Sequence, residues 1–151
     1  MSLANIFQTA SQGMTAQRER LETASANLAN ANTTRTAEGG PYRRRDVIFE
    51  TAPAATPDSP FAAQFNSFDD NQPVALGVRA TTVVTGADSG VKHYQPGHPD
   101  ADQDGYVMMP DVDPLEETVN ILSAARAFEA NATAFNTAKE MARATLKLSE
   151  A

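Results

Sequence analysis

Residues 2–32 read SLANIFQTASQGMTAQRERLETASANLANAN, and their apolar side chains recur at alternating steps of four and three. The stretch contains no Pro and a single Gly, at position 13. Such spacing places side chains on one face of a helix, so it predicts one long helix with an apolar seam. The seam positions are Leu3, Phe7, Ala10, Met14, Gln17, Leu21, Ala24, Leu28 and Ala31. The run of Asn residues at its end, including Asn27 and Asn30, predicts the change from helix to turn.

A second helix of the same design is predicted between residues 115 and 151, which hold neither Gly nor Pro. Asp113 suits the cap of this helix and Pro114 suits its first turn. The same stepping gives a seam at Ile121, Ala125, Phe128, Ala132, Phe135, Lys139, Ala142 and Leu146. Further apolar residues lie off this seam, at Leu122, Ala124, Ala138, Met141 and Ala144. Because one helix pair cannot bury both sets, the pattern favours packing against neighbouring subunits.

Residues 33–114 hold all nine Pro residues and every Gly but one. Their Val, Ile and Thr content predicts strands at 45–50 and 76–85 and weaker strands at 91–95 and 106–109. We expect a turn at 86–90 to join the second and third strands as a hairpin. Residues 51–75 are Pro-rich and are interpreted as a loop or mobile insertion. Phe61, Phe65 and Phe68 belong either to an ordinary surface loop or to a segment that docks on a neighbouring protein.

The predicted fold class is therefore α+β, with the two terminal helices paired as an antiparallel coiled coil around a small β-hairpin and loop-rich middle. Three parts are expected: an N-terminal helix at 1–34, a middle at 35–113 that contains the 51–75 insertion, and a C-terminal helix at 114–151. The predicted assembly interface consists of Leu3, Phe7, Met14, Leu21, Leu28, Asn27, Asn30, Ile121, Ala125, Phe128, Ala132, Phe135, Ala142 and Leu146.

Charge and composition exclude several classes of function. The chain of 151 residues has a net charge of −7, and residues 51–114 alone carry two basic and nine acidic side chains. An acidic middle argues against nucleic-acid binding, which needs clustered Lys and Arg. The one basic run, at 43–45, is interpreted as a solvated edge or a local salt-bridge cluster. No Cys is present for disulfides or thiol chemistry, no apolar run is long enough to span a bilayer, and a cleaved secretory signal is not expected.

One acidic motif resembles part of a calcium loop. Asp100, Asp102 and Asp104 precede Gly105 with the D-x-D-x-D-G spacing of the first half of such a loop. The twelfth position holds Asp111 instead of the bidentate Glu, and a Pro on each side disfavours the flanking helices. An acidic surface turn explains the same residues, and a calcium-binding module at 100–111 stays open as an alternative function.

No arrangement of residues indicates catalysis or a cofactor. His93 and His98 are the only histidines, and their spacing matches no familiar metal site. The sequence lacks both a G-x-S-x-G turn and a phosphate-binding Gly loop. We therefore expect a protein that is not an enzyme, with no cofactor and no metal.

Residues 25–34, SANLANANTT, resemble the S-x-N-L-A-N-x-x-T signature near the start of flagellar axial proteins, the family of rod and hook subunits. Residues 39–50, 94–113 and 119–139 resemble further segments of its proximal-rod members.

The resemblance implies a structural subunit of the flagellar basal-body proximal rod, a hollow helical drive shaft that transmits torque. It also implies export through the flagellar type III apparatus without a cleaved signal, a periplasmic location, and other rod proteins and copies of itself as partners. Neither nucleic acid nor membrane insertion is expected. A soluble coiled-coil adaptor is the other alternative.

Overall fold

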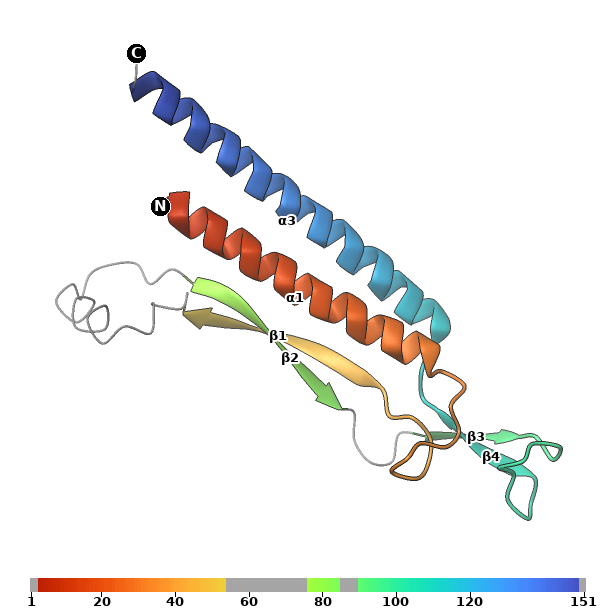
Figure 1. Ribbon diagram of the computed structural model, residues 1–151. Coiled ribbons are helices and arrows are strands. Elements are labelled where there is room, and N and C mark those ends of the chain that lie inside the picture. The colour runs from red at the N-terminus through yellow and green to blue at the C-terminus, as the bar shows by residue number, and fades with distance from the viewer. Residues whose placement is uncertain (1–2, 54–75, 85–89, 150–151) are drawn as a thin grey trace. The chain divides into compact units, whose positions relative to one another are not determined.

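The computed structural model describes residues 3–53, 76–84 and 90–149. The chain is α+β, with a long helix at each end and two small antiparallel hairpins between them (Figure 1). The elements are α1 (Leu3–Ala29), β1 (Arg45–Pro53), β2 (Leu76–Val84), β3 (Gly90–Tyr94), β4 (Tyr106–Pro110) and α3 (Pro114–Ser149). The α+β prediction is confirmed.

Helix α3 begins where the sequence predicts it. The backbone N–H of Leu115 donates a hydrogen bond of 2.8 Å to the carboxylate of Asp113, and the N–H of Glu117 donates one of 3.0 Å to the Asp113 carbonyl. Asp113 thus caps amide groups that lack partners inside the helix. Glu116 and Glu117 in the first turn and Lys147 in the last turn match the helix dipole.

Helix α1 ends in the Asn-rich segment. The side-chain amide of Asn30 donates a hydrogen bond of 2.9 Å to the Ala26 carbonyl, and its oxygen accepts one of 3.2 Å from the Thr33 hydroxyl. The following loop folds back on itself, since the N–H of Tyr42 donates to the Thr33 carbonyl at 3.0 Å. Gly39 within this loop has a φ of +87°, in the left-handed region that favours glycine.

The strands form two separate two-stranded sheets. β1 pairs with β2, and β3 pairs with β4 in a register that runs from Gly90 opposite Pro110 to Tyr94 opposite Tyr106. The rings of Tyr94 and Tyr106 meet edge to face with centroids 5.3 Å apart. The predicted hairpin between the second and third strands is wrong, because each of them pairs with a different partner. The turn at 86–89 and residues 54–75, with the three Phe residues, lie outside the described residues.

The chain divides into two compact units, and both helices contribute to each. In the first unit, built from residues 1–17, 49–80 and 126–151, the rings of Phe7 and Phe135 meet edge to face at 5.0 Å. Gly13 lies against the side chain of Asn131, while the neighbouring Gln12 side chain packs on Gly77. Within this unit α1 therefore has α3 on one side and β2 on another.

In the second unit, built from residues 18–48 and 81–125, α1 likewise contacts both α3 and β2. The guanidinium of Arg20 donates a hydrogen bond of 2.8 Å to the Asn120 side chain on α3. The hydroxyl of Thr82 on β2 donates one of 3.0 Å to the Glu19 carboxylate on α1.

The buried side chains are mostly small. They include Ala10, Ala16 and Ala24 on α1, Ala31 just after its end, and Ala124 and Ala138 on α3. Placing Ala124 and Ala138 off the seam was wrong, because they are 0% and 3% exposed, whereas Lys139 is exposed. The predicted helical period was right, but two buried positions, Ala124 and Ala138, each lie one residue before the predicted seam positions Ala125 and Lys139.

Candidate functional site

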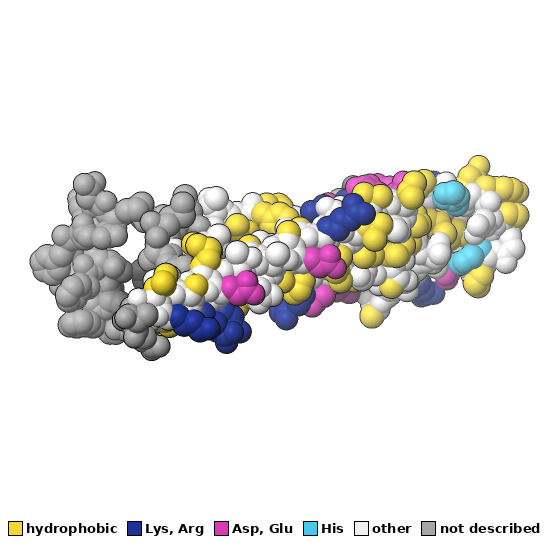
Figure 2. Space-filling model, turned by 90° about the horizontal axis from the view of Figure 1, so that it is seen from above, with side chains coloured by type: hydrophobic (Ala, Val, Ile, Leu, Met, Phe, Trp, Pro, Cys, Tyr) yellow, Lys and Arg dark blue, Asp and Glu magenta, His cyan; other side chains and the backbone are white. Residues whose placement is uncertain are grey.

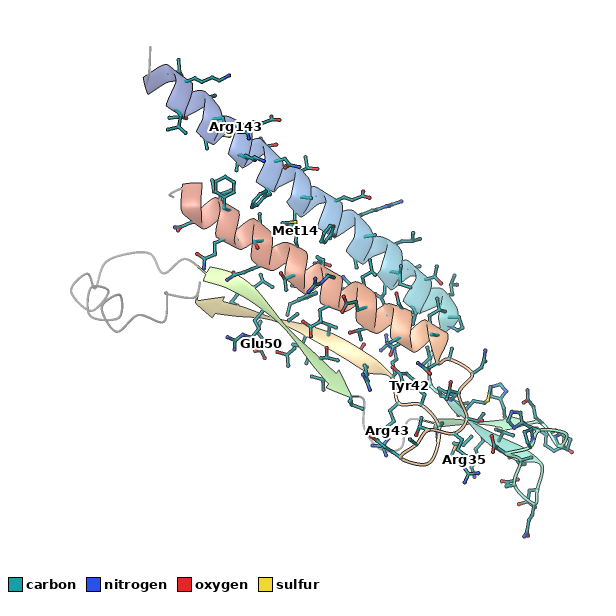
Figure 3. All side chains as sticks on the ribbon, in the orientation of Figure 1. Met14, Arg35, Tyr42, Arg43, Glu50 and Arg143 are labelled. Atoms are coloured by element: carbon teal, nitrogen blue, oxygen red, sulfur yellow. The ribbon has the colours of Figure 1, made fainter. Side chains whose placement is uncertain are left out.

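The residues predicted for the assembly interface occupy different environments. Those half-buried within the chain are Phe7, Met14, Leu21, Leu28, Asn30, Ile121, Ala125, Ala132, Phe135 and Ala142. Phe128 is exposed and Leu146 is 64% exposed, whereas Asn27 is buried. The side chain of Leu3 lies outside the described residues. Met14 is marked on α1 in Figure 3.

A second apolar face lies on the exposed side of α3. In its first turns Leu115 is 73% exposed, Val119 58% and Leu122 55%, and their spacing of four and three places them on one face. In the later part of α3, Met141 and Leu148 are exposed at a spacing of seven. Apolar side chains reach the surface over much of the face that Figure 2 shows. Large exposed apolar patches of this kind commonly mark interaction surfaces.

The most elaborate polar arrangement surrounds Asn27, which is 1% exposed. Its side-chain oxygen accepts hydrogen bonds of 3.0 Å from the Tyr42 hydroxyl and from the Arg45 N–H. Its side-chain nitrogen donates to the Arg45 carbonyl at 2.8 Å and to the Glu117 carboxylate at 3.3 Å. All the hydrogen-bonding capacity of this amide is therefore used within the second unit.

Glu117 is also 1% exposed, and its charge is matched by Arg44. The Nε of Arg44 donates a hydrogen bond of 2.8 Å to Oε1 of Glu117, while Oε2 accepts from Asn27. The other guanidinium nitrogens reach Asp46 at 2.9 Å and Glu116 at 3.1 Å. Each oxygen of this buried carboxylate therefore has a hydrogen-bond donor, and the Arg44 guanidinium pairs its charge.

The surroundings shift two pKa values. Burial raises the pKa of Tyr42, the Arg45 guanidinium opposes that shift, and the Glu117 carboxylate adds to it. For Arg44, burial acts to lower the pKa, but the hydrogen bond to Glu117 and the surrounding carboxylates raise it above its ordinary value. Both groups therefore keep their ordinary neutral-pH forms, a neutral phenol and a charged guanidinium. We call Asn27, Tyr42, Arg44, Arg45 and Glu117 the Asn27 network.

The basic run at 43–45 divides between two roles. Arg44 turns inward as part of a salt-bridge cluster, which confirms one of the two interpretations of the run. Arg43 and Arg45 line an open cavity of about 410 Å³ that also includes Tyr42 and Val84. Tyr42 and Arg43 lie on the segment between α1 and β1 (Figure 3).

Two carboxylates of the acidic turn between β3 and β4, those of Asp100 and Asp102, accept hydrogen bonds from other groups of the chain. Asp102 accepts hydrogen bonds from the N–H groups of Asp104 at 3.0 Å and Tyr106 at 2.8 Å. Asp100 accepts one of 2.7 Å from the Thr34 hydroxyl. Among residues 3–53, 76–84 and 90–149, no three His, Asp or Glu side chains gather as a possible ligand set for a metal ion.

The two histidines differ in their surroundings. His93 is exposed on β3, and His98 is half-buried, with its Nδ1 accepting a hydrogen bond of 3.1 Å from the Asp100 N–H. Both side chains are visible on the surface in Figure 2. In the described part of the chain, no helix combines the length and apolar character needed to cross a membrane.

The sequence pattern indicated Asn27 but not its partner Glu117, nor Arg44, which pairs with Glu117. Arg44 was interpreted only as part of a basic run, and Glu117 was not among the predicted interface residues. Each residue had a local signal: Arg44 lies two residues before the acidic Asp46, and Glu117 lies in the first turn of α3. Nothing local, however, connects two positions 73 residues apart.

Two family models match the chain. The model described as "Flagella basal body rod protein" matches residues 7–35, and the model of the C-terminal part of flagellar basal body rod FlgEFG proteins matches residues 103–148. Together these matches cover most of α1 and α3.

Curated relatives match over almost the whole chain. The flagellar basal-body rod protein FlgC of Borreliella burgdorferi is 39% identical, over 98% of this chain and 98% of its own length. The protein of the same name from Escherichia coli is 39% identical over 99% of this chain and its full length. That of Bacillus subtilis is 33% identical over 98% of this chain and 99% of its own.

Proposed function

The chain belongs to the FlgC family of flagellar basal-body rod proteins, and we propose that it builds the proximal rod as a subunit of a hollow helical drive shaft that transmits torque. The observation that carries this is the match to FlgC relatives from end to end at up to 39% identity. The family is a structural one, so the chain is not an enzyme.

The terminal helices pair as an antiparallel coiled coil in this proposal. In the first unit Phe7 meets Phe135, and Gly13, further along α1, meets Asn131, earlier along α3. In the second unit Arg20 bonds Asn120, and the buried Asn27 bonds Glu117. These contacts support opposite helix directions in each unit. Small residues such as Ala124 allow helices to approach closely.

Neighbouring subunits pack on the exposed apolar face of α3 at Leu115, Val119 and Leu122. The exposure of these three side chains supports this choice, because burying one such side chain contributes about 1.5–3 kcal/mol. The residues predicted from the seam complete the interface where they stay accessible, above all Phe128 and Leu146. Many contacts along a stiff helix suit a shaft that carries torque.

The three parts of the chain divide the work in the assembly. Residues 1–34 and 114–151 form the packed helices, and residues 35–113 provide outer contacts. The partners are other rod proteins and copies of this chain, in the part of the basal body that crosses the periplasm. Delivery is through the flagellar type III export apparatus.

Complementation tests this function. In a bacterium that lacks its own FlgC, the chain should restore motility and be found by mass spectrometry in purified hook–basal bodies. The variant Leu122→Asp should fold normally by circular dichroism yet be absent from basal bodies, while the matched control Ser123→Asp should be incorporated. A chain that is missing from basal bodies of motile cells would overturn the proposal.

A further inference from the structure

The Asn27 side chain joins three segments of the chain at one point. Its amide exchanges two hydrogen bonds with the backbone of Arg45, the first residue of β1, at 2.8 and 3.0 Å. An antiparallel strand neighbour makes the same pair of bonds, so the amide takes the place of a strand partner. The same amide bonds Glu117 in the first turn of α3.

Only one side chain satisfies this position. Asp would lose both donated hydrogen bonds and would place a second carboxylate against Glu117. Leu would match the volume but leave the Tyr42 hydroxyl and the Arg45 backbone without their partner. Gln would move the amide by one methylene and could not meet all four partners at their present distances.

The apolar packing around the network defines the helix register poorly. The buried apolar side chains beside the network are small: Ala24 lies one turn before Asn27 on α1, and Ala124 lies one heptad after Glu117 on α3. A shift of α3 by seven residues would bring Ala124 to the level that Glu117 now occupies. Ala packs equally well at either level, whereas Asn27 would lose Glu117 and Glu117 would lose Arg44.

We propose that Asn27 and Glu117 determine the register of α1 against α3, and that Arg44 and Arg45 tie β1 to that same register. Within the second unit the buried apolar side chains Ala24 and Ala124 are small and constrain the alignment little, so the Asn27 network selects one alignment there. Buried polar groups have this role in other helical assemblies, where a single Asn fixes the register. The proposal concerns the folding of one chain and does not depend on rod assembly.

Cross-linking of engineered Cys pairs tests the proposal, because the natural chain contains no Cys. The pair Arg20→Cys and Asn120→Cys reports the observed register, since these two side chains are hydrogen-bonded. The pair Arg20→Cys and Ala127→Cys reports a slip of one heptad, a displacement of roughly 10 Å along the helix. A short bismaleimide is added to the purified full chain, and the rates of intramolecular cross-linking are compared by gel mobility.

In the chain with its network intact, we expect fewer than about one molecule in a hundred to adopt the slipped register. In the variants Asn27→Leu and Glu117→Gln, we expect more than about one molecule in ten to adopt it. The matched controls are Asn30→Ala, which removes only local bonds, and Glu116→Gln, whose side chain is 61% exposed. Both should keep the original ratio of rates.

Circular dichroism verifies that each variant keeps its helices. Glu117→Gln is almost unchanged in size, so it decides the question if Asn27→Leu does not fold. Unchanged ratios in both network variants would overturn the proposal. So would equal effects in the controls, or equal cross-linking of the two pairs in the chain with its network intact.

Discussion

Removal of the Arg44 guanidinium should destabilise the fold far more than removal of its neighbour. In Arg44→Met the Glu117 carboxylate, whose side chain is 2% exposed, keeps only the neutral Asn27 donor at 3.3 Å. Breaking a buried ion pair on one side costs about 3–5 kcal/mol, and the lower half of that range applies because the Arg44 side chain is itself 20% exposed. Against a total stability of about 5–15 kcal/mol, the loss is large.

Urea unfolding followed by circular dichroism measures the effect, provided that the slope of the transition stays constant. Arg43→Met is the matched control, since this exposed side chain should change stability by no more than about 0.5 kcal/mol. Arg44→Met with Glu117→Gln should recover part of the loss, with a coupling of about 1–3 kcal/mol. A loss below about 1 kcal/mol in Arg44→Met, or no recovery in the double variant, would refute this reasoning.

Three other predictions concern single side chains. Phe135→Ala should cost about 2–3 kcal/mol, because it removes a half-buried ring that packs edge to face on Phe7, and a loss below about 1 kcal/mol in the same urea assay would contradict the packing. Burial raises the pKa of Tyr42 in the folded chain above its unfolded value of 10.0. The neutral phenol therefore contributes its full stability below pH 10.0, and this contribution is lost as the pH rises through the pKa of the folded chain. Tyr42→Phe should therefore weaken the alkaline decline of stability, and identical pH profiles above pH 10.0 would count against the buried phenol. Gly105 has a φ of +81° and an added Cβ would lie 3.0 Å from the Tyr94 ring, so Gly105→Ala should cost about 1–3 kcal/mol in thermal unfolding, whereas an unchanged midpoint would show a relaxed turn.

The positions of the helices and strands could be predicted in part from local sequence patterns. Helix ends depend on capping and on Pro and Gly, which act within a few residues, so Asp113 and Pro114 located the start of α3. Strand positions followed from β-branched residues, with bounds within a few residues of those observed. Strand pairing is a contact between distant segments, and the prediction of the wrong hairpin partner for β2 shows the limit of local turn signals.

The candidate site shows the same limit more sharply. Asn27 and Asn30 belong to one sequence signature and looked equivalent, yet Asn27 bonds Glu117 at a separation of 90 residues while Asn30 bonds its own helix end. The difference depends on which face of α1 meets α3, and a heptad pattern defines that face only to within about one residue. The same uncertainty of one residue explains why Ala124 was assigned to the outer side.

The most direct test of rod assembly through α3 is site-specific photo-cross-linking in purified hook–basal bodies. A photoreactive amino acid at position 122 would report what lies against this exposed face, and one at Ser123 serves as the neighbouring control. If neighbouring subunits pack on α3, irradiation at position 122 joins the chain to another rod protein or to a second copy, with an adduct seen by mass spectrometry. Recovery of only the uncross-linked chain from basal bodies that contain it would contradict assembly through this face.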